Sequence, residues 1–96
     1  MIKHIVCYKL LNPSAEVLAK AEETFLSMKG RIDEIRELVV GIDKLRSPRS
    51  YDMVLEVVFD DFEAMKNYQN NPYHVNVVKK YIHSVVDKSV SVDFEF

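Results

Sequence analysis

Two stretches of this sequence alternate as β-strands do, and both place apolar side chains on the two faces of the strand. Successive side chains of a strand point to opposite faces, so every second residue shares one face. In residues 51–59 both faces are largely apolar, with Met53, Leu55, Val57 and Phe59 on one and Val54, Glu56 and Val58 on the other. Residues 2–11 divide in the same way, with Ile2, His4, Val6, Tyr8 and Leu10 opposite Lys3, Ile5, Cys7, Lys9 and Leu11. A fold that contains such strands must cover both faces of their sheet.

The periodicity of the remaining chain predicts an α+β order of elements. Residues 14–29 have helical apolar spacing, and Asp60 or Asp61 is expected to cap a second helix that ends at Asn70-Asn71-Pro72. Pro72 suits the first turn of a third helix, which extends to about residue 86. Residues 38–45 and 90–96 are predicted to be strands, and Gly41 marks a bulge or a close approach to the backbone. This order predicts a ferredoxin-like fold: a four-stranded antiparallel sheet with helices on one face.

Helices on one face leave the other face of the predicted sheet uncovered. That face carries Ile5, Cys7, Val54 and Val58. An exposed apolar face costs about 25 cal/mol per Å² of surface that could be buried. We therefore expect a homodimer in which a second copy packs sheet to sheet. Glu56 lies amid this face and is expected to pair with a Lys or Arg across the interface, because a buried unpaired carboxylate is costly.

Composition argues against several classes of function. The chain has 13 Lys and Arg against 15 Asp and Glu, so no basic excess points to nucleic acid. No apolar run reaches the roughly 18 residues of a membrane span, and the N-terminus lacks the layout of a signal peptide. The single Cys7 fits a reducing compartment, and the cytoplasm is the expected location. We expect one domain, residues 1–96, that binds neither nucleic acid nor membrane.

The helix predicted after Pro72 has one apolar and one polar side. The stripe expected to face the core consists of His74, Val77, Val78, Tyr81 and Val85. The opposite, solvated stripe consists of Asn76, Lys79, Lys80, His83 and Asp87. Helical phase therefore predicts that His74 is inside the protein and that His83 is on its surface.

His4 and Tyr68 are expected to meet His74 in one pocket. His4 shares a strand face with Val6 and Tyr8, and Tyr68 lies at the end of the preceding helix. Cys7 is on the opposite strand face from His4, which argues against a nucleophilic Cys–His pair. Because a buried His can act as an acid or base near neutral pH, the cluster is a candidate for proton transfer.

Each of these side chains also has a structural interpretation. An inward His near a helix start is commonly a hydrogen-bonded core residue, and Tyr68 could donate its hydroxyl to a backbone carbonyl. The sequence has no ligand spacing typical of zinc, no Gly-rich phosphate loop and no hydrolase serine motif. We therefore expect neither a metal nor a cofactor.

Four segments resemble the stress-responsive dimeric α/β-barrel (Dabb) family. They are Lys3-His-Ile-Val-Cys-Tyr-Lys9, Leu55-Glu-Val-Val-Phe59, Tyr68-Gln-Asn-Asn-Pro-Tyr-His74 and Val92-Asp-Phe94. The spacing Tyr-x-x-x-Pro-x-His after a Glu-Val-x-Phe strand is the most specific part. Asn71 departs from the pattern, since a His often precedes the Pro in the family. The resemblance implies a ferredoxin-like fold whose sheets pair into a barrel across a dimer.

The resemblance also implies possible functions. A plant member closes a polyketide chain by an aldol condensation, and its motif residues fall on His4, Tyr68 and His74. In that comparison His74 is the general base, Tyr68 holds or polarises a carbonyl, and His4 assists by orientation. The first expectation is that the chain binds a small apolar or aromatic molecule in a pocket lined by Val6, Tyr8, Phe25, Met28 and Tyr81, and a cofactor-free enzyme that uses His74 and Tyr68 is the alternative. The fold is also compatible with a cofactor-free monooxygenase and with a non-enzymatic stress-related protein.

Overall fold

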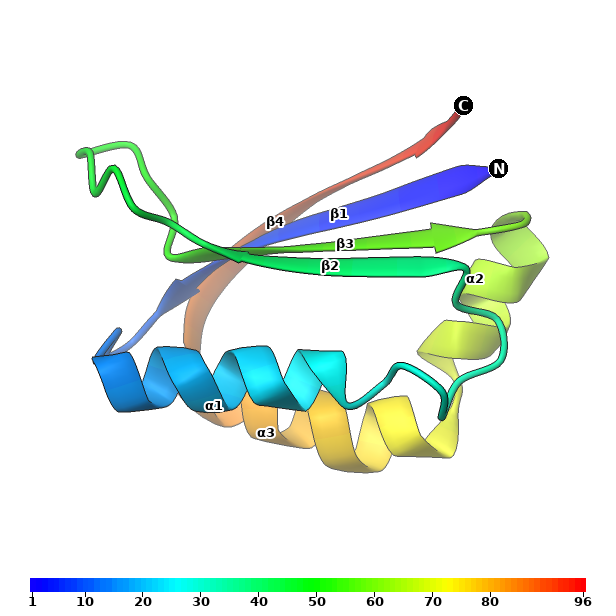
Figure 1. Cartoon of the computed structure of the whole chain (residues 1–96), viewed down its shortest axis with the longest axis horizontal. Helices are drawn as coiled ribbons and strands as arrows, with labels where there is room; N and C mark the ends of the chain where they lie inside the picture. Colours follow the sequence, from blue (N-terminus) through cyan, green and yellow to red (C-terminus); the bar gives the residue numbers. More distant parts are fainter.

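The computed structural model describes all residues, 1–96, and contains the strands and helices expected from the sequence. The elements are β1 (Ile2–Leu10), α1 (Ala15–Leu26), β2 (Glu37–Ile42), β3 (Met53–Phe59), α2 (Phe62–Gln69), the π-helix η1 (His74–Lys79), α3 (Lys80–Val85) and β4 (Val86–Glu95). The four strands form one antiparallel sheet in the order β2-β3-β1-β4. Figure 1 shows α1 and α3 side by side beneath one face of this sheet. The predicted ferredoxin-like α+β fold is confirmed.

The core lies between the sheet and the helices. The predicted inner face of β3 is fully buried: Met53, Leu55, Val57 and Phe59. Ser14 Oγ accepts the Val17 N–H at 3.2 Å and caps α1, and Asp61 Oδ1 accepts the Ala64 N–H at 2.8 Å and caps α2. These caps set the positions at which the two helices begin. No helix is long and apolar enough to cross a membrane.

The predicted close approach at Gly41 is confirmed. β2 passes through Gly41 in unbroken register with β3. A Cβ atom at this position would lie only 3.0 Å from Val54 Cγ1, which is closer than side chains normally pack. The absence of a side chain at Gly41 therefore lets Val54 pack against the backbone of β2.

The segment after Pro72 departs from the predicted regular helix. His74–Lys79 forms a π-helix before α3 begins, and a π-helix has an extra residue in each turn. The extra residue rotates the following side chains away from their α-helical phase. Val77, which was predicted to face the core, is 45% exposed, whereas Ile82 is buried. The segment was predicted correctly, but its core-facing stripe was wrong at these two positions.

The sheet face without helices is apolar along its centre. Strand register places seven side chains there: Ile5, Cys7, Val39, Val54, Val90, Val92 and Phe94. We call this set the outer sheet face. Its four most accessible members, Val39, Val90, Val92 and Phe94, are exposed by 53, 53, 61 and 40%. Such a patch is typical of a surface that binds another protein.

Two predictions for this face need correction. Glu56 pairs with Lys3 of its own chain, with Nζ 3.9 Å from Oε1, so it does not depend on a partner across an interface. Val58 is buried although it was expected to be uncovered. Lys3 and Glu37 flank Val58 in the sheet, and their long side chains can cover a small residue between them.

Candidate functional site

A cavity of about 450 Å³ opens between the sheet and the helices. Its wall includes His4, Tyr68 and His74, the three side chains that the sequence predicted would converge. The other lining residues are Val6, Tyr8, Phe25, Gln69, Asn70, Val78, Lys79, Ile82, His83, Val86 and Ser89. The cavity thus draws on β1, α1, α2, the helical segment after Pro72, and β4.

The five residues predicted to line a pocket divide into two groups. Val6, Tyr8 and Phe25 line the cavity, but Met28 and Tyr81 do not. Met28 is fully enclosed in the hydrophobic core. The Tyr81 ring lies beneath the Lys20 ammonium group at 4.7 Å, so it faces α1 rather than the cavity. The altered helical phase after the π-helix accounts for the position of Tyr81.

Tyr68 and His74 stack against each other without a hydrogen bond between them. Their ring centroids are 4.3 Å apart with an interplanar angle of 35°. Phe59 packs on the Tyr68 ring at 4.9 Å, and His4 approaches it edge-on at 6.3 Å. The stack fixes both rings and forms no hydrogen bond to the Tyr68 hydroxyl or to His74 Nδ1.

The Tyr68 hydroxyl and His74 Nδ1 are buried and have no hydrogen-bond partner within the protein. About 90% or more of buried polar groups have such a partner, because burying one without it costs about 1–3 kcal/mol. The structural interpretation of Tyr68, in which its hydroxyl donates to a backbone carbonyl, is therefore wrong. Both residues line the cavity, so its wall contains two polar side chains whose buried atoms have no partner in the protein.

His4 has a partner that sequence reasoning missed. Its Nδ1 contacts Asp93 Oδ1, and the two residues face each other across the β1–β4 ladder. The carboxylate fixes the orientation of the His4 ring. Strand parity places His4 on the correct face but does not identify its cross-strand partner. The only sign of this pair in the sequence is the Asp residue within the segment Val92-Asp-Phe94.

Asn71, where the chain departs from the family pattern, fixes the start of the helix that carries His74. Its Oδ1 accepts the backbone N–H groups of Tyr73 at 2.8 Å and His74 at 3.3 Å. Unpaired N–H groups in a first helical turn need such acceptors. Asn71 therefore helps to position His74 without itself lining the cavity.

Burial keeps His74, Tyr8 and Tyr68 neutral at pH 7. Burial, together with smaller contributions from the nearby charges of Lys79 and His4, lowers the pKa of His74 to about 4. Burial raises the pKa of Tyr8 to about 12 and raises the pKa of Tyr68, with Tyr8 adding to the shift. The inner wall accordingly presents a neutral imidazole that can accept a proton and two phenols that can donate hydrogen bonds.

We expect the His74 imidazole to titrate near pH 4 in the folded protein. Since an unfolded His has a pKa near 6.5, protons favour the unfolded state, and stability falls as the pH decreases from about 6.5 to about 4. Histidine Cε1–H shifts measured by NMR against pH would test this, with His74→Phe used to assign the signal. A His74 midpoint near 6.5 would show that the imidazole is solvated and would contradict the buried geometry.

Two residues of the predicted solvated stripe also reach the cavity. Lys79 and His83 are exposed, as predicted, yet both line the cavity and so lie at its opening. Sequence reasoning assigned them to the surface alone, because an exposed residue that borders an opening has the same pattern as any solvated residue. No group of three or more His, Cys, Asp or Glu side chains is arranged to hold a metal ion.

Comparisons with known proteins agree with this fold. The model of the family described as "Stress responsive A/B Barrel Domain" (Dabb) matches residues 2–96. An uncharacterised protein of Streptomyces coelicolor is 31% identical over 78 residues, which cover 77% of this chain and 79% of that protein.

Solved structures show the same arrangement. A dimeric protein of unknown function with a ferredoxin-like fold, from Bacteroides fragilis, superposes with a TM-score of 0.85 at 26% identity, covering 99% of this chain and 95% of that one. A hydroxynitrile lyase from Passiflora edulis superposes with a TM-score of 0.79, covering 97% and 90% of the two chains. Its 17% identity means that this likeness shows the fold alone.

Proposed function

The chain belongs to the stress-responsive A/B barrel (Dabb) family, and from its cavity we propose that it is a homodimer that binds a small apolar or aromatic molecule in each subunit. The observation that carries this proposal is the pair of unpartnered atoms, the Tyr68 hydroxyl and His74 Nδ1. A ligand that accepts a hydrogen bond from Tyr68, or donates one to His74, would remove the cost of leaving them unpaired.

The size and lining of the cavity support a small ligand. Its volume of about 450 Å³ falls within the range of known ligand pockets, roughly 300–1,000 Å³. Val6, Phe25, Val78 and Ile82 contribute apolar surface, and the polar groups are few. This combination suits an aromatic or alicyclic body that carries one or two oxygen atoms.

Proton transfer at a carbon next to a carbonyl is the reaction that this wall would best support. In such a step neutral His74 takes a proton from the carbon, and the C–H electrons form an enolate whose oxygen accepts a hydrogen bond from Tyr68. The enolate charge beside His74 raises the pKa of the imidazole, so the base becomes stronger as the reaction proceeds. His4, held by Asp93, would orient the substrate. The proton returns from His74 to a carbon atom of the product.

The dimer is supported by the outer sheet face and by a related structure. The exposed apolar side chains of β2 and β4 are joined across the sheet by Ile5, Cys7 and Val54, and Glu56 lies within this face, paired with Lys3. A largely apolar exposed face of this kind is typical of a protein interface. The Bacteroides fragilis protein of the same fold is dimeric. Because the cavity is on the opposite side of the sheet, each subunit would keep its own site.

A thermal-shift screen with a panel of aryl ketones and aromatic carboxylic acids tests the binding proposal. We expect some compounds to raise the Tm of the wild type and to have no effect on Ser89→Trp, because Ser89 lines the cavity and a large ring there would fill it. Ser84→Trp is the matched control, since Ser84 is exposed on α3 outside the cavity. A panel without any stabilising compound, or compounds that still stabilise Ser89→Trp, would favour the non-enzymatic structural protein.

A further inference from the structure

The opening of the cavity carries positive charge without a compensating acid. The fourteen lining residues include one Lys and three His but no Asp or Glu. Lys79 forms none of the ion pairs in the structure and none of its cation–π contacts. Its ammonium group is therefore available to a ligand.

The π-helix brings Lys79 to the same side as His74. These residues are five apart, and in an α-helix of 3.6 residues per turn they would point about 140° away from each other. In a π-helix the hydrogen bond runs from i to i+5, so residues five apart lie nearly above one another. η1 begins at His74 and ends at Lys79, and both residues line the cavity. The charge of Lys79 also reaches His74, since it contributes to the lowered pKa of the imidazole.

We propose that the ligand is a carboxylate on a small aromatic or apolar body, with the carboxylate paired to Lys79 at the opening and the body inside the cavity. This inference rests on the proposed binding function and adds the charge of the ligand to it. In this arrangement the apolar part lies among Val6, Phe25 and Ile82, and a polar group farther inside meets Tyr68 and His74. His83, also at the opening, adds a second donor for the carboxylate.

A pair of probes that differ only in charge tests the proposal. 2-Naphthoate and 2-naphthamide have nearly the same shape, and NMR titration of the isotope-labelled protein measures both Kd values and locates the bound probe. We expect the wild type to prefer the carboxylate by about twofold to fivefold, a size typical of one solvated ion pair. Increasing the NaCl concentration should weaken binding of the carboxylate and leave the amide unaffected.

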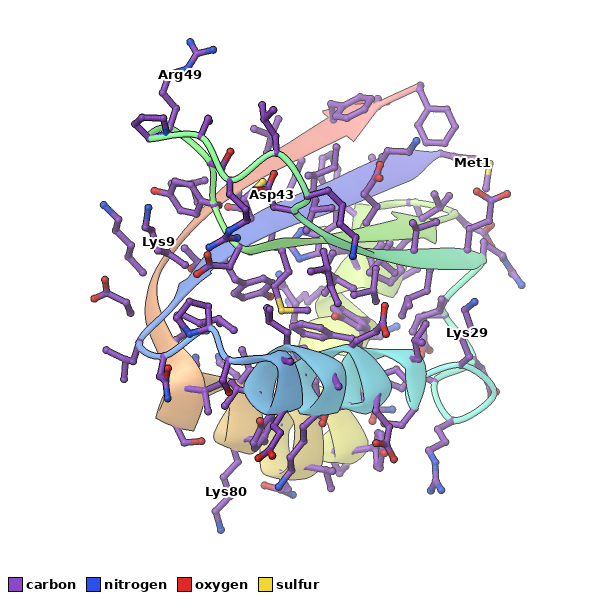
Figure 2. All side chains as sticks on the ribbon, turned by 60° about the vertical axis from the view of Figure 1, so that its left-hand side comes forward. Met1, Lys9, Lys29, Asp43, Arg49 and Lys80 are labelled. Atoms are coloured by element: carbon purple, nitrogen blue, oxygen red, sulfur yellow. The ribbon has the colours of Figure 1, made fainter.

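Two neighbouring lysines provide the variant and its control. Lys79→Gln should remove the preference for the carboxylate and leave the Kd of the amide within about twofold. Lys80→Gln should change neither Kd, because Lys80 is outside the lining and its side chain points away from the sheet in Figure 2.

The outcomes separate the two proposals. If both probes bind in the cavity and Lys79→Gln retains the preference for the carboxylate, the role of Lys79 is overturned while the binding function stands. A wild type that binds the carboxylate and the amide equally well would also overturn the role of Lys79 and leave the binding function in place. If neither probe perturbs residues of the cavity at saturating concentration, the proposed binding function fails, and the inference fails with it.

Discussion

Val92→Asp is expected to convert the protein from a dimer to a monomer. Val92 is the most exposed member of the outer sheet face and lies on β4 opposite Ile5 of β1. A carboxylate buried there without a partner would cost about 2–3 kcal/mol in each copy. In a twofold interface the cost counts twice, so the Kd of the dimer should increase by about a thousandfold or more.

Sedimentation velocity at micromolar concentration measures this effect. The wild type should sediment with twice the mass of the chain, and Val92→Asp with the mass of one chain. Ser91→Asp is the matched control, because Ser91 is exposed on the other face of β4 and pairs with Val6 on the helix side. A wild type that is monomeric at this concentration would overturn the sheet-to-sheet dimer, as would a dimeric Val92→Asp.

Tyr68→Phe is expected to make the protein more stable and less active. The Tyr68 hydroxyl is buried without a partner, so its removal should raise the free energy of unfolding by about 1 kcal/mol and the Tm by about 4–8 °C. The same change removes the donor to the enolate oxygen, which should slow proton transfer about a hundredfold. His74→Ala removes the base and should slow it by about 10²- to 10⁴-fold.

Exchange of the methyl protons of 2-acetylnaphthalene in D₂O, followed by ¹H NMR, provides a direct assay of proton transfer. Asn76→Ala serves as the control, because Asn76 is exposed on η1 and does not line the cavity. If Tyr68→Phe lowers the Tm, the hydroxyl has a structural partner and the unpartnered geometry is contradicted. If exchange by the wild type equals the rate without protein, the protein has no proton-transfer activity toward this ketone, and only the binding function remains.

Features of the fold that depend on local periodicity could be predicted from the sequence. Alternation along β1 and β3 identified the buried faces, and it placed His4 toward the helices and Cys7 away from them. The position of Tyr68 before Pro72 and the helical phase of His74 then brought all three polar side chains to one cavity. Each of these inferences needs only the geometry of a single element.

Features that depend on register or on irregular backbone could not be predicted. Asp93 meets His4 only because β1 and β4 pair in one particular register, and Glu56 meets Lys3 for the same reason between β1 and β3. The π-helix has no clear mark in the sequence, yet it moves Lys79 to the cavity. Regular helical phase therefore misplaces Lys79, the residue that we propose selects a negatively charged ligand.

The central claim is that a small aromatic ligand occupies the cavity against Tyr68 and His74. Intermolecular nuclear Overhauser effects (NOEs) between 2-naphthoate at saturating concentration and the protein test it most directly, because they identify the protein protons that lie next to the bound ligand. We predict NOEs from the naphthalene protons to the rings of Tyr68 and His74. NOEs only to the methyl groups of Val90 and Val92, on the outer sheet face, would contradict it.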